Sequence, residues 1–340
     1  MAGLFEYDLA ATDLSIHELG DTLIRTINVD IPFTKMVKKG KTQTNVIAQW
    51  PAHFPKAQTD IARKEGEDKT DGFGKNVPET LYSLVQLNRS EGWMLTDKAK
   101  RTNVSYAKTE AERIAGQKLS DSEAFLLARE RVFLSAQQPA LASVAADGKD
   151  RTTGMFSWLN PTQPAGVFGV PAKCRLTADQ WYTAAIAALT ETGFRNMMRA
   201  TSKRIKTNNK KWLGLVGVDL GNVLNSFASN TTINAALQVN RDQKVRSYEN
   251  IVTAFMFPEG SVDIMTHYNL ACDPLTGADT EYTHRSGAFI DPDMWRLAPF
   301  QPVEDKEGID LGAGPRGWWE SAEVLQCLQP MTQFAVYANA

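Results

Sequence analysis

The fold follows from one stretch of the chain, Lys41-Thr-Gln-Thr-Asn-Val-Ile-Ala-Gln-Trp50. Its side chains alternate between the two faces of an extended strand. One face carries Thr42, Thr44, Val46, Ala48 and Trp50. The other face carries mainly amides, with Ile47 as the exception, and a period of two residues is typical of a half-buried β-strand. Pro51 is expected to end this strand.

A second extended run, at residues 81–87, is expected to pair back on the first. Between the two runs lies a polar stretch rich in Lys, Asp and Glu, which ends at Pro78. The pattern therefore predicts a long β-hairpin with a charged tip, within a unit that spans residues 41–105. So long a projection cannot bury both of its faces within one subunit, and we expect it to need a partner surface.

The residues before the hairpin, 1–40, predict an N-terminal arm. They open with apolar and aromatic side chains at Leu4, Phe5 and Tyr7, and Pro32 stops any helix at their far end. A terminus rich in apolar side chains frays unless something docks it. The arm is therefore expected to bind either its own core or a neighbour.

The residues after the hairpin predict one long helix, at 107–138 within a unit that spans 106–139. Apolar side chains recur along one stripe, Glu and Arg fill the remainder, and Pro139 closes the segment. The pattern Ser120-x-x-Glu123 is a capping box, which allows a kink or a restart at that point. An unbroken helix of this length would span about 45 Å, which is long for a compact domain.

Residues 140–285 predict a mixed domain, and residues 286–340 predict loops and returning strands. A loop-rich stretch leads to a second helix, which the capping box Thr177-x-x-Gln180 announces and which continues to about Ser202. The rest is expected to be rich in strands: an apolar run at residues 212–220, a buried strand at 251–257, and a turn into a strand at 262–265.

The composition is that of an ordinary globular protein. Apolar residues make up 43% of the 340 positions and charged residues 22%, which excludes the signature of disorder. No stretch approaches the roughly 20 apolar residues of a membrane span, and the opening lacks the pattern of a signal peptide. The cysteines, Cys174, Cys272 and Cys327, are odd in number and far apart, so we expect buried thiols and neither disulfides nor a zinc site.

Charge is distributed unevenly along the chain. Residues 199–246 hold nine Lys or Arg and two Asp or Glu, whereas residues 257–340 hold four basic and thirteen acidic residues. One interpretation is ordinary solvated surface. The other is self-complementarity, in which a basic segment of one copy meets an acidic segment of the next.

Motifs for catalysis or metal binding are weak. The pattern G-x-G-x-x-G at residues 312–317 matches a dinucleotide fingerprint, but Pro315 and the two tryptophans after it favour a turn, and too little chain follows for the required βαβ unit. The four histidines, His17, His53, His267 and His284, lack metal-ligand spacing. The sequence Asp291-Pro-Asp293 is better explained by a turn than by a cation site. No cofactor or metal is expected.

Five segments, taken in order, resemble the major head proteins of tailed bacteriophages. Four of them are Ile31-Pro-Phe33 with the lysine-rich stretch that follows, Asn103-Val-Ser105 before the long helix, Arg151-Thr-Thr-Gly-Met-Phe-Ser-Trp-Leu159, and the strand pair at residues 248–267. The fifth is Phe289-Ile-Asp-Pro-Asp-Met-Trp-Arg-Leu-Ala-Pro-Phe300. The resemblance extends from about residue 15 onward.

This resemblance implies an α+β fold of the Hong Kong 97 type, with an N-terminal arm, an extended hairpin (E-loop), a spine helix in a peripheral domain, and an axial domain. It implies a structural protein and not an enzyme: copies would form hexamers and pentamers of an icosahedral virion capsid around double-stranded DNA. The capsid would assemble in the cytoplasm of a bacterial host, without a membrane. Decoration, scaffolding and portal proteins are the other expected partners.

Two sets of residues are candidates for contacts in such a shell. Contacts between subunits are expected at Phe33, Lys38, Lys39, Lys41, Lys64, Lys69, Lys75 and Arg89. Residues that could meet DNA phosphates are Lys203, Arg204, Lys206, Lys210 and Lys211. For this second set, salt bridging between subunits or plain solvation is the favoured explanation.

Two other functions remain open at this point. A portal or tail protein is one, although a long hairpin followed by a spine-like helix argues against it. A cytosolic enzyme with a dispersed active site is the other, and it would form a small oligomer where a shell protein forms large particles. Some capsids of this type carry Lys-Asn crosslinks, but no Asn or Glu is marked here as the partner of a hairpin lysine, so we expect a non-covalent shell.

Overall fold

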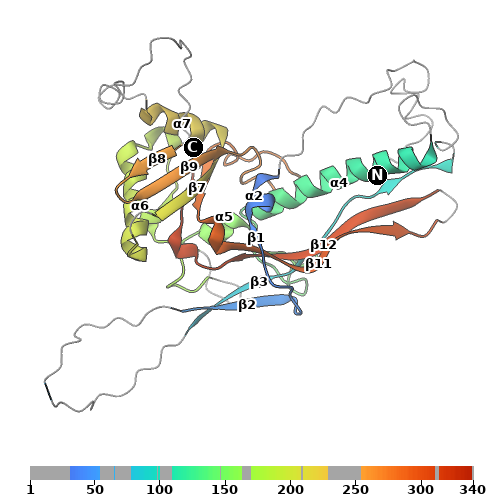
Figure 1. Cartoon of the computed structure of the whole chain (residues 1–340), viewed down its shortest axis with the longest axis horizontal. Coiled ribbons are helices and arrows are strands. Elements are labelled where there is room, and N and C mark those ends of the chain that lie inside the picture. The colour runs from blue at the N-terminus through green and yellow to red at the C-terminus, as the bar shows by residue number, and fades with distance from the viewer. Residues whose placement is uncertain are drawn as a thin grey trace, which may run out of the picture.

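The computed structural model describes residues 31–53, 65, 78–97, 99, 109–145, 147–162, 170–207, 210–228, 254–310 and 314–338. The predicted arm before residue 31 and most of the hairpin tip therefore lie outside the described residues, as does Asn103-Val-Ser105. The described elements form an elongated molecule, in which a six-stranded sheet with its helices occupies one end (Figure 1). A long helix and two long paired strands, at residues 295–308 and 316–327, extend from it toward the other end.

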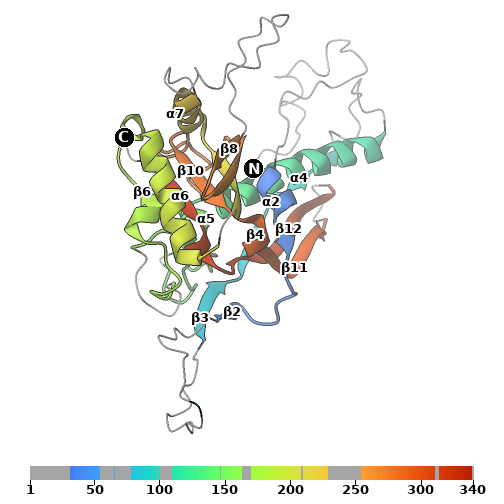
Figure 2. The same cartoon turned by 60° about the vertical axis from the view of Figure 1, so that its left-hand side comes forward.

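The six-stranded sheet has the order β6-β13-β10-β7-β9-β8. Its strands are β6 (Trp181–Tyr182), β7 (Lys210–Val216), β8 (Ala254–Phe257), β9 (Gly260–Thr266), β10 (Ser286–Ile290) and β13 (Phe334–Tyr337). The helices α6 (Glu191–Ile205) and α7 (Val218–Ala228) pack on one face, around a cluster that includes Phe194, Leu220, Trp212 and Phe289 (Figure 2). The short helix α5 (Met155–Leu159) packs on the opposite face, and all five of its residues are buried.

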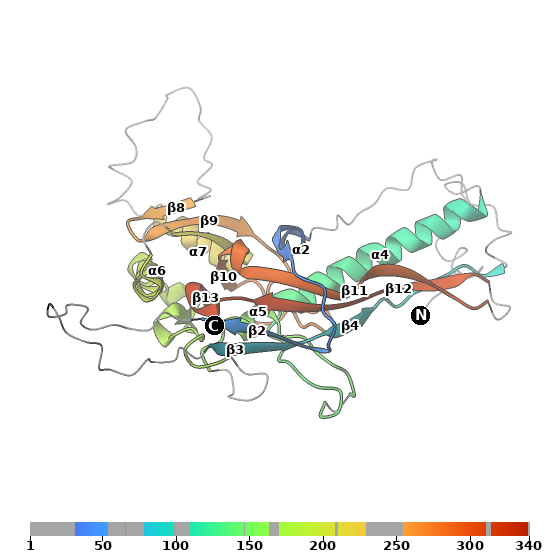
Figure 3. The same cartoon turned by 60° about the horizontal axis from the view of Figure 1, so that its bottom comes forward.

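The second sheet contains β1 (Lys38–Lys39), β11 (Trp295–Gly308), β12 (Arg316–Cys327) and β4 (Gln86–Arg89) in that order, and β5 (Trp93–Met94) also pairs with β12. The helix α4 (Glu110–Leu134) runs along one face of this sheet. On the other face, a ribbon of β2 (Ile47–Ala52) and β3 (Glu79–Leu84) covers the part of the sheet near the body (Figure 3). The short helix α2 (Pro32–Met36) precedes β1 and packs against α4 through Phe33.

The predicted hairpin pairing is confirmed for β3, but the predicted run 81–87 is divided, because residues 86 and 87 belong to β4, which pairs with β12. β2 and β3 are antiparallel, with Ile47 opposite Leu84 and Trp50 opposite Leu81. Ala48 is buried and Ile47 is exposed, as the alternation predicts. The prediction that Pro51 ends the strand is wrong, since β2 continues through Pro51 to Ala52. Among the described strands β2 pairs with β3 alone, and an edge strand tolerates proline because one side of it needs no ladder hydrogen bond.

The long helix is confirmed, but both of its ends differ from the prediction. The capping box is formed by Thr109 and Glu112: Glu112 N donates to Thr109 Oγ1 at 3.2 Å, and Thr109 N donates to Glu112 Oε2 at 3.1 Å. Ser120 lies inside the continuous helix, so the expected kink is absent from α4. The helix stops at Leu134, before Pro139, because Ser135 becomes extended and its carbonyl accepts a hydrogen bond from Phe156 N in α5.

The second helix begins later than predicted. The capping box of Thr177 and Gln180 exists, but it starts only the 3₁₀ turn η1 (Ala178–Gln180). The next residues form β6, which pairs in parallel with β13, so tertiary pairing ends the helical segment. After a second 3₁₀ turn, η2 (Ile186–Ala188), helix α6 starts from a new cap, at which the Thr190 side chain accepts from Gly193 N.

Two further strand predictions need correction. Residues 212–220 divide into the end of β7 and the start of α7, with Gly217 between them, where a Cβ atom would lie only 2.5 Å from the carbonyl oxygen of His284. The described part of the predicted buried strand 251–257 is β8, an edge strand whose residues are half-buried or exposed. The turn from β8 into β9 is confirmed by their antiparallel pairing.

Two short links join the two sheets, and together we call them the waist. The first is residues 291–294, with the 3₁₀ turn η4 (Pro292–Met294) between β10 and β11; the second is residues 328–333, with η5 (Pro330–Thr332) between β12 and β13. Leu328 N donates to the carbonyl of Met294 at 2.8 Å, which ties the links together. The buried Trp295 donates from Nε1 to Gln333 Oε1 at 2.9 Å. The run 289–300, singled out from the sequence, therefore crosses from one sheet to the other.

Candidate functional site

Among the described residues, no group of three or more His, Cys, Asp or Glu side chains is placed to hold a metal ion. No described helix is both long and apolar enough to cross a membrane. The three cysteines are buried free thiols, as predicted from their spacing.

The described histidines make local contacts. His267 is 3% exposed, and its Nε2 lies 3.3 Å from Oε1 of the buried Glu130. His284 lies at the surface, with its Nε2 3.3 Å from Asp279 Oδ2. His53 is exposed beyond β2, and His17 lies outside the described residues.

The Asp291-Pro-Asp293 turn binds two ammonium groups of its own chain. Lys210 Nζ lies 2.8 Å from Asp291 Oδ2, and both of these side chains are mostly buried. Lys38 Nζ lies 2.8 Å from Asp293 Oδ1 at the surface. The carboxylates of this turn thus fasten β7 and β1 to the waist.

The residues predicted to contact other subunits occupy different environments. Phe33 is 1% exposed and packs edge to face on Trp295, so its side chain belongs to the core of its own subunit. Lys39 and Lys41 are exposed. Arg89 forms a two-point contact with Glu320, 2.9 Å from Nε and 2.7 Å from Nη2 to the same carboxylate oxygen. The three tip residues, Lys64, Lys69 and Lys75, lie outside the described residues.

The residues predicted to face DNA do not form one continuous surface. Lys203, Lys206 and Lys211 are exposed at the end of α6 and the start of β7. Arg204 is half-buried and donates to the carbonyl oxygens of Arg175 and Lys173 and to Gln180 Oε1. Lys210 is bound to Asp291, as described above. Three of the five side chains are therefore available to a phosphate.

A hollow with two exposed apolar side chains lies on the β2–β3 ribbon. Val46 is 46% exposed and Ile47 is 40% exposed, and with Asn45, Gln49 and Tyr82 they line a shallow hollow of about 440 Å³. The opposite face of the ribbon packs on the second sheet through Ala48 and Val85. The ribbon thus packs one face on its own subunit and leaves this hollow, with Val46 and Ile47 beside amide side chains, open to solvent.

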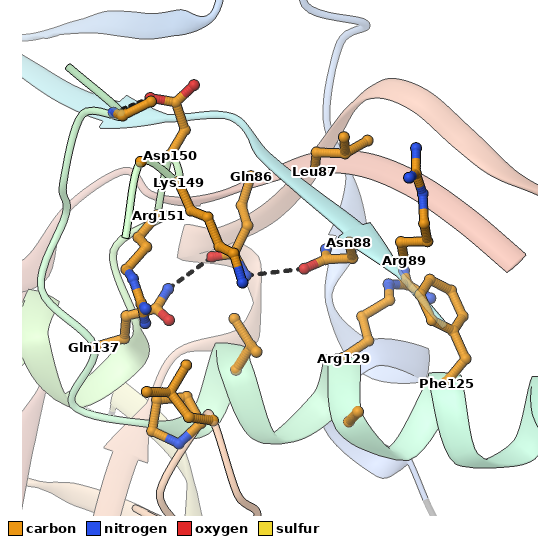
Figure 4. A pocket seen from close by; sticks show the side chains of 16 residues that line it. Gln86, Leu87, Asn88, Arg89, Phe125, Arg129, Gln137, Lys149, Asp150 and Arg151 are labelled. Carbon is orange, nitrogen blue, oxygen red and sulfur yellow. Dashed lines mark hydrogen bonds between the residues drawn. The ribbon is translucent and has the colours of Figure 1, made fainter. Parts of the chain in front are cut away.

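A larger groove, of about 630 Å³, runs beside β4 (Figure 4). Four separate segments form its walls: β4, the C-terminal half of α4, and two loops, one with Lys149–Asp150–Arg151 and one with Leu275. The α4 wall presents Phe125 and Arg129 toward β4. No sequence pattern marks this groove, because its residues come from positions far apart in the chain.

A buried ion pair lies at the base of the groove. Arg129 Nη2 donates to Glu323 Oε2 at 2.9 Å, and the two side chains are 10% and 4% exposed. Two buried donors of groove residues, Arg129 Nε and Asn88 Nδ2, have no hydrogen-bond partner in the part of the chain that the structure describes. Buried polar groups are normally paired, so these two are exceptions that call for an explanation.

Comparison with known proteins identifies the chain's relatives. Residues 6–332 match the family model described as SU10 major capsid protein. No curated protein sequence matches. The capsid structure of cyanophage P-SCSP1u is similar at 14% identity and a TM-score of 0.58, over 96% of this chain and 94% of that one.

Two other solved structures show the same similarity of fold. The capsid asymmetric unit of cyanophage A-1(L) gives a TM-score of 0.64 at 11% identity, over 98% of this chain and 99% of that one. A structure of the Phage G gp27 major capsid proteins and gp26 decoration proteins gives 0.51 at 11% identity, over the whole of both chains. Because the family match covers nearly the whole chain and the structural neighbours are phage capsids, this chain belongs to the SU10 major capsid protein family, has the Hong Kong 97-type fold and builds the shell of a phage head.

Proposed function

We propose that copies of this chain associate in hexameric and pentameric rings and close into an icosahedral shell around double-stranded DNA. The observation that carries the proposal is the open hollow on the β2–β3 ribbon, where Val46 and Ile47 are exposed beside Tyr82. A ribbon that packs one face on its own subunit and still exposes apolar side chains gains stability by covering a second subunit, and a closed assembly repeats each such contact.

The parts of the subunit have distinct roles in this proposal. Residues 1–40 are the arm, and residues 41–105 are the E-loop. The spine helix, at 106–139, and the returning strands, at 286–340, form the peripheral domain, while residues 140–285 form the loop and the axial domain. An axial role for residues 140–285 is supported by the compact group of α6, α7, β6, β7, β8 and β9, which lies at the end of the molecule opposite to the free ends of β11 and β12 (Figure 1). Two of the returning strands, β10 and β13, cross into this group and complete its sheet.

Other partners belong to the same proposal. The shell takes a portal, scaffolding and decoration proteins as partners, and it assembles in the cytoplasm of its bacterial host. The role is structural and not enzymatic. Packaged DNA meets the exposed Lys203, Lys206 and Lys211 through its phosphates, without sequence preference.

The first experiment is expression of the chain alone, followed by sedimentation and electron microscopy. Closed shells of many copies, or their curved fragments, are expected. A solitary monomer, or rings and tubes without shells, would overturn the proposal. A ladder of multimers that survives denaturing electrophoresis under reducing conditions would show that the shell is not held by non-covalent contacts alone.

Two matched triple variants separate the proposed surfaces. Reversing the hairpin tip, with Lys64→Glu, Lys69→Glu and Lys75→Glu, is expected to abolish shells while leaving the circular dichroism of the subunit unchanged. Reversing Lys203, Lys206 and Lys211 to Glu changes the net charge equally, but it should leave shell yield intact. In a plot of the logarithm of the DNA-binding constant against the logarithm of the salt concentration, the slope should become shallower by about 0.9 for every phosphate that the protein no longer neutralises. Normal shells from the tip variant would contradict the role of the tip.

A further inference from the structure

The buried carboxylate of Glu130 lies where three parts of the subunit meet. Glu130 belongs to α4, and α2 lies beside it near the end of β9 (Figure 3). The two carboxylate oxygens accept hydrogen bonds from the backbone amides of Phe33 and Thr34 in α2, at 2.8 and 2.9 Å. Glu130 Oε1 also lies 3.3 Å from Nε2 of His267, the residue that follows β9. One side chain of α4 therefore contacts both α2 and the end of the six-stranded sheet.

The neighbours of His267 fix which of its two ring nitrogens carries the proton. The backbone amide of Asn269 donates to His267 Nδ1 at 3.1 Å, so Nδ1 is an acceptor and carries no proton. In a neutral imidazole the proton is then on Nε2. Because Nε2 faces Glu130 Oε1, the contact between the two side chains is a hydrogen bond from the imidazole to the carboxylate.

The imidazole is held in place by the six-stranded sheet. The backbone amide of His267 donates to the carbonyl of Val216, the last residue of β7, at 2.8 Å. Four residues later, Ala271 N donates to the carbonyl of Leu134, the last residue of α4, at 3.1 Å. The segment from His267 to Ala271 thus joins the sheet to α4, and the ring moves with the sheet.

Glu130 depends on its neighbours for a fixed orientation. Its side chain has three rotatable bonds, and ordering such a chain costs conformational entropy. It is fully buried, and a buried carboxylate is costly unless hydrogen bonds compensate its charge. His267 supplies a donor from a position 137 residues away in the chain, on an element other than α2 and α4.

We propose that His267 is a positioning residue, which orients the Glu130 carboxylate so that the attachment of α2 to α4 depends on the place of the six-stranded sheet. The predicted arm enters the described structure at α2, so the same bond links the start of the arm to the sheet. A shift of the sheet along α4 would withdraw the imidazole and loosen α2. The inference goes beyond the proposed function, because it concerns a link within one subunit and holds with or without a shell.

Two amide variants of His267 separate its two side-chain bonds. In His267→Gln the side-chain amide reaches the position of Nε2 and can still donate to Glu130. In His267→Asn the shorter side chain reaches only the position of Nδ1, so it keeps the bond from Asn269 and loses the bond to Glu130. Both variants bury one amide group in place of the ring, so they are matched in polarity.

Hydrogen exchange of the full-length chain, followed by mass spectrometry, compares the two variants at Phe33 and Thr34. Exchange of these amides should be about tenfold faster in His267→Asn, because a hydrogen bond to a charged group is lost. It should stay within about threefold of the unmodified chain in His267→Gln, which keeps that bond. Exchange at Ala271 should be the same in both variants. Equal exchange of Phe33 in the two variants would overturn the inference.

Two further variants test whether the effect passes through the carboxylate. Adding His267→Asn to Glu130→Ala should leave Phe33 exchange within about twofold of Glu130→Ala alone, because the two changes remove one interaction. An effect that multiplies in the double variant would contradict the proposed route. The control is His284→Asn, which removes a surface histidine 3.3 Å from its own carboxylate partner, Asp279, and should not change exchange at Phe33.

The unmodified chain gives a readout that does not depend on the folding of any variant. Nitrogen NMR of histidine-labelled protein should show a protonated Nε2 and an unprotonated Nδ1 for His267. A proton on Nδ1 would overturn the inference, because the Asn269 amide could not donate to that nitrogen. Failure of the unmodified chain to form shells would count against the proposed function and would leave these measurements valid for the subunit.

Discussion

The carboxylate of Glu130 in α4 accepts a hydrogen bond from the backbone amide of Phe33 in α2, with 2.8 Å between Phe33 N and Glu130 Oε1. Its other oxygen accepts from the amide of Thr34 at 2.9 Å and from the Thr34 hydroxyl. Glu130 is fully buried, so the first amides of α2 have no water to replace it. We expect Glu130→Ala to lower the free energy of unfolding by about 1–3 kcal/mol for each amide left unpaired.

Hydrogen exchange at Phe33 and Thr34 measures this effect locally. Both amides should exchange faster in Glu130→Ala than in the unmodified chain. Glu130→Gln keeps one carbonyl acceptor, so its effect should be intermediate. Unchanged exchange at Phe33 in Glu130→Ala would show that the carboxylate does not hold α2.

The buried Arg129–Glu323 pair predicts a second stability effect. Removing either partner leaves the other charge buried, so Arg129→Leu or Glu323→Leu alone should cost about 3–5 kcal/mol in urea unfolding. The double variant should be more stable than either single variant. The comparison is the Arg89–Glu320 pair, whose arginine side chain is 57% exposed, and Arg89→Leu should cost less than either change at the buried pair. A double variant as unstable as the sum of the singles would contradict the prediction.

The capping box at Thr109 predicts a third effect on stability. Thr109→Ala should destabilise the first turn of α4 by about 0.5–2 kcal/mol, because the amide of Glu112 loses its acceptor. Ser120→Ala is the matched control: Ser120 lies on the exposed side of the continuous helix, so the change should stay within about 0.5 kcal/mol. Exchange of the first-turn amides distinguishes the two sites. If Ser120→Ala lowered the free energy of unfolding more than Thr109→Ala, the helix would be capped at Ser120, as the sequence suggested, and not at Thr109.

Acid should loosen the attachment of β1 to the waist. The hydrogen bond from Lys38, and then the Lys38 charge, hold the pKa of Asp293 below its usual range. A carboxyl whose pKa is lower in the folded chain stabilises the fold above its unfolded pKa, and this contribution disappears as the pH falls through the folded pKa. The attachment should therefore weaken below about pH 4.

Carboxyl-carbon NMR titration follows Asp293 directly. Lys38→Gln should move the pKa of Asp293 back toward the normal value, whereas Lys39→Gln, next in the chain, should leave it unchanged. An Asp293 pKa that does not rise in Lys38→Gln would show that the ion pair is not formed in solution.

The three thiols should resist alkylation in the folded protein. Burial raises the pKa of the Cys174 thiol to about 11, and burial also raises the pKa of Cys272 and of Cys327 above the ordinary value. At pH 8 only about one Cys174 side chain in a thousand is the reactive thiolate. Mass spectrometry should find no rapid iodoacetamide adduct on the folded chain and three adducts after denaturation. Fast modification of any one thiol in the folded chain would place that thiol at the surface.

Local patterns predicted the elements of this fold better than their ends. The alternation through Ala48 and Trp50 identified the β2–β3 pairing, because one face of the ribbon is packed and the other is not. The boxes at Ser120 and Thr177 were misleading for different reasons. Ser120 lies inside α4, where the backbone hydrogen bonds of the helix continue past it. Thr177 does cap a turn, but that turn ends where β6 pairs with β13.

The contacts between distant segments could not be predicted from the sequence. Glu130 and Phe33 are separated by 97 positions, and Arg129 and Glu323 by 194. Neither carboxylate lies in a recognisable motif, and a buried Glu in a helix resembles any other Glu in a local pattern. The groove beside β4 was missed for the same reason, whereas the buried cysteines could be inferred from their number and spacing alone.

The waist has a mechanical consequence. Its two links are short, they are hydrogen-bonded to each other through Leu328 and Met294, and Trp295 is buried beside them. Bending the subunit there would break these bonds and expose an indole ring, so we expect the two sheets to turn together as a stiff lever. Rings of five and rings of six then differ in how whole subunits tilt. The contacts between neighbouring subunits change to fit the different tilts, while the subunit itself stays rigid.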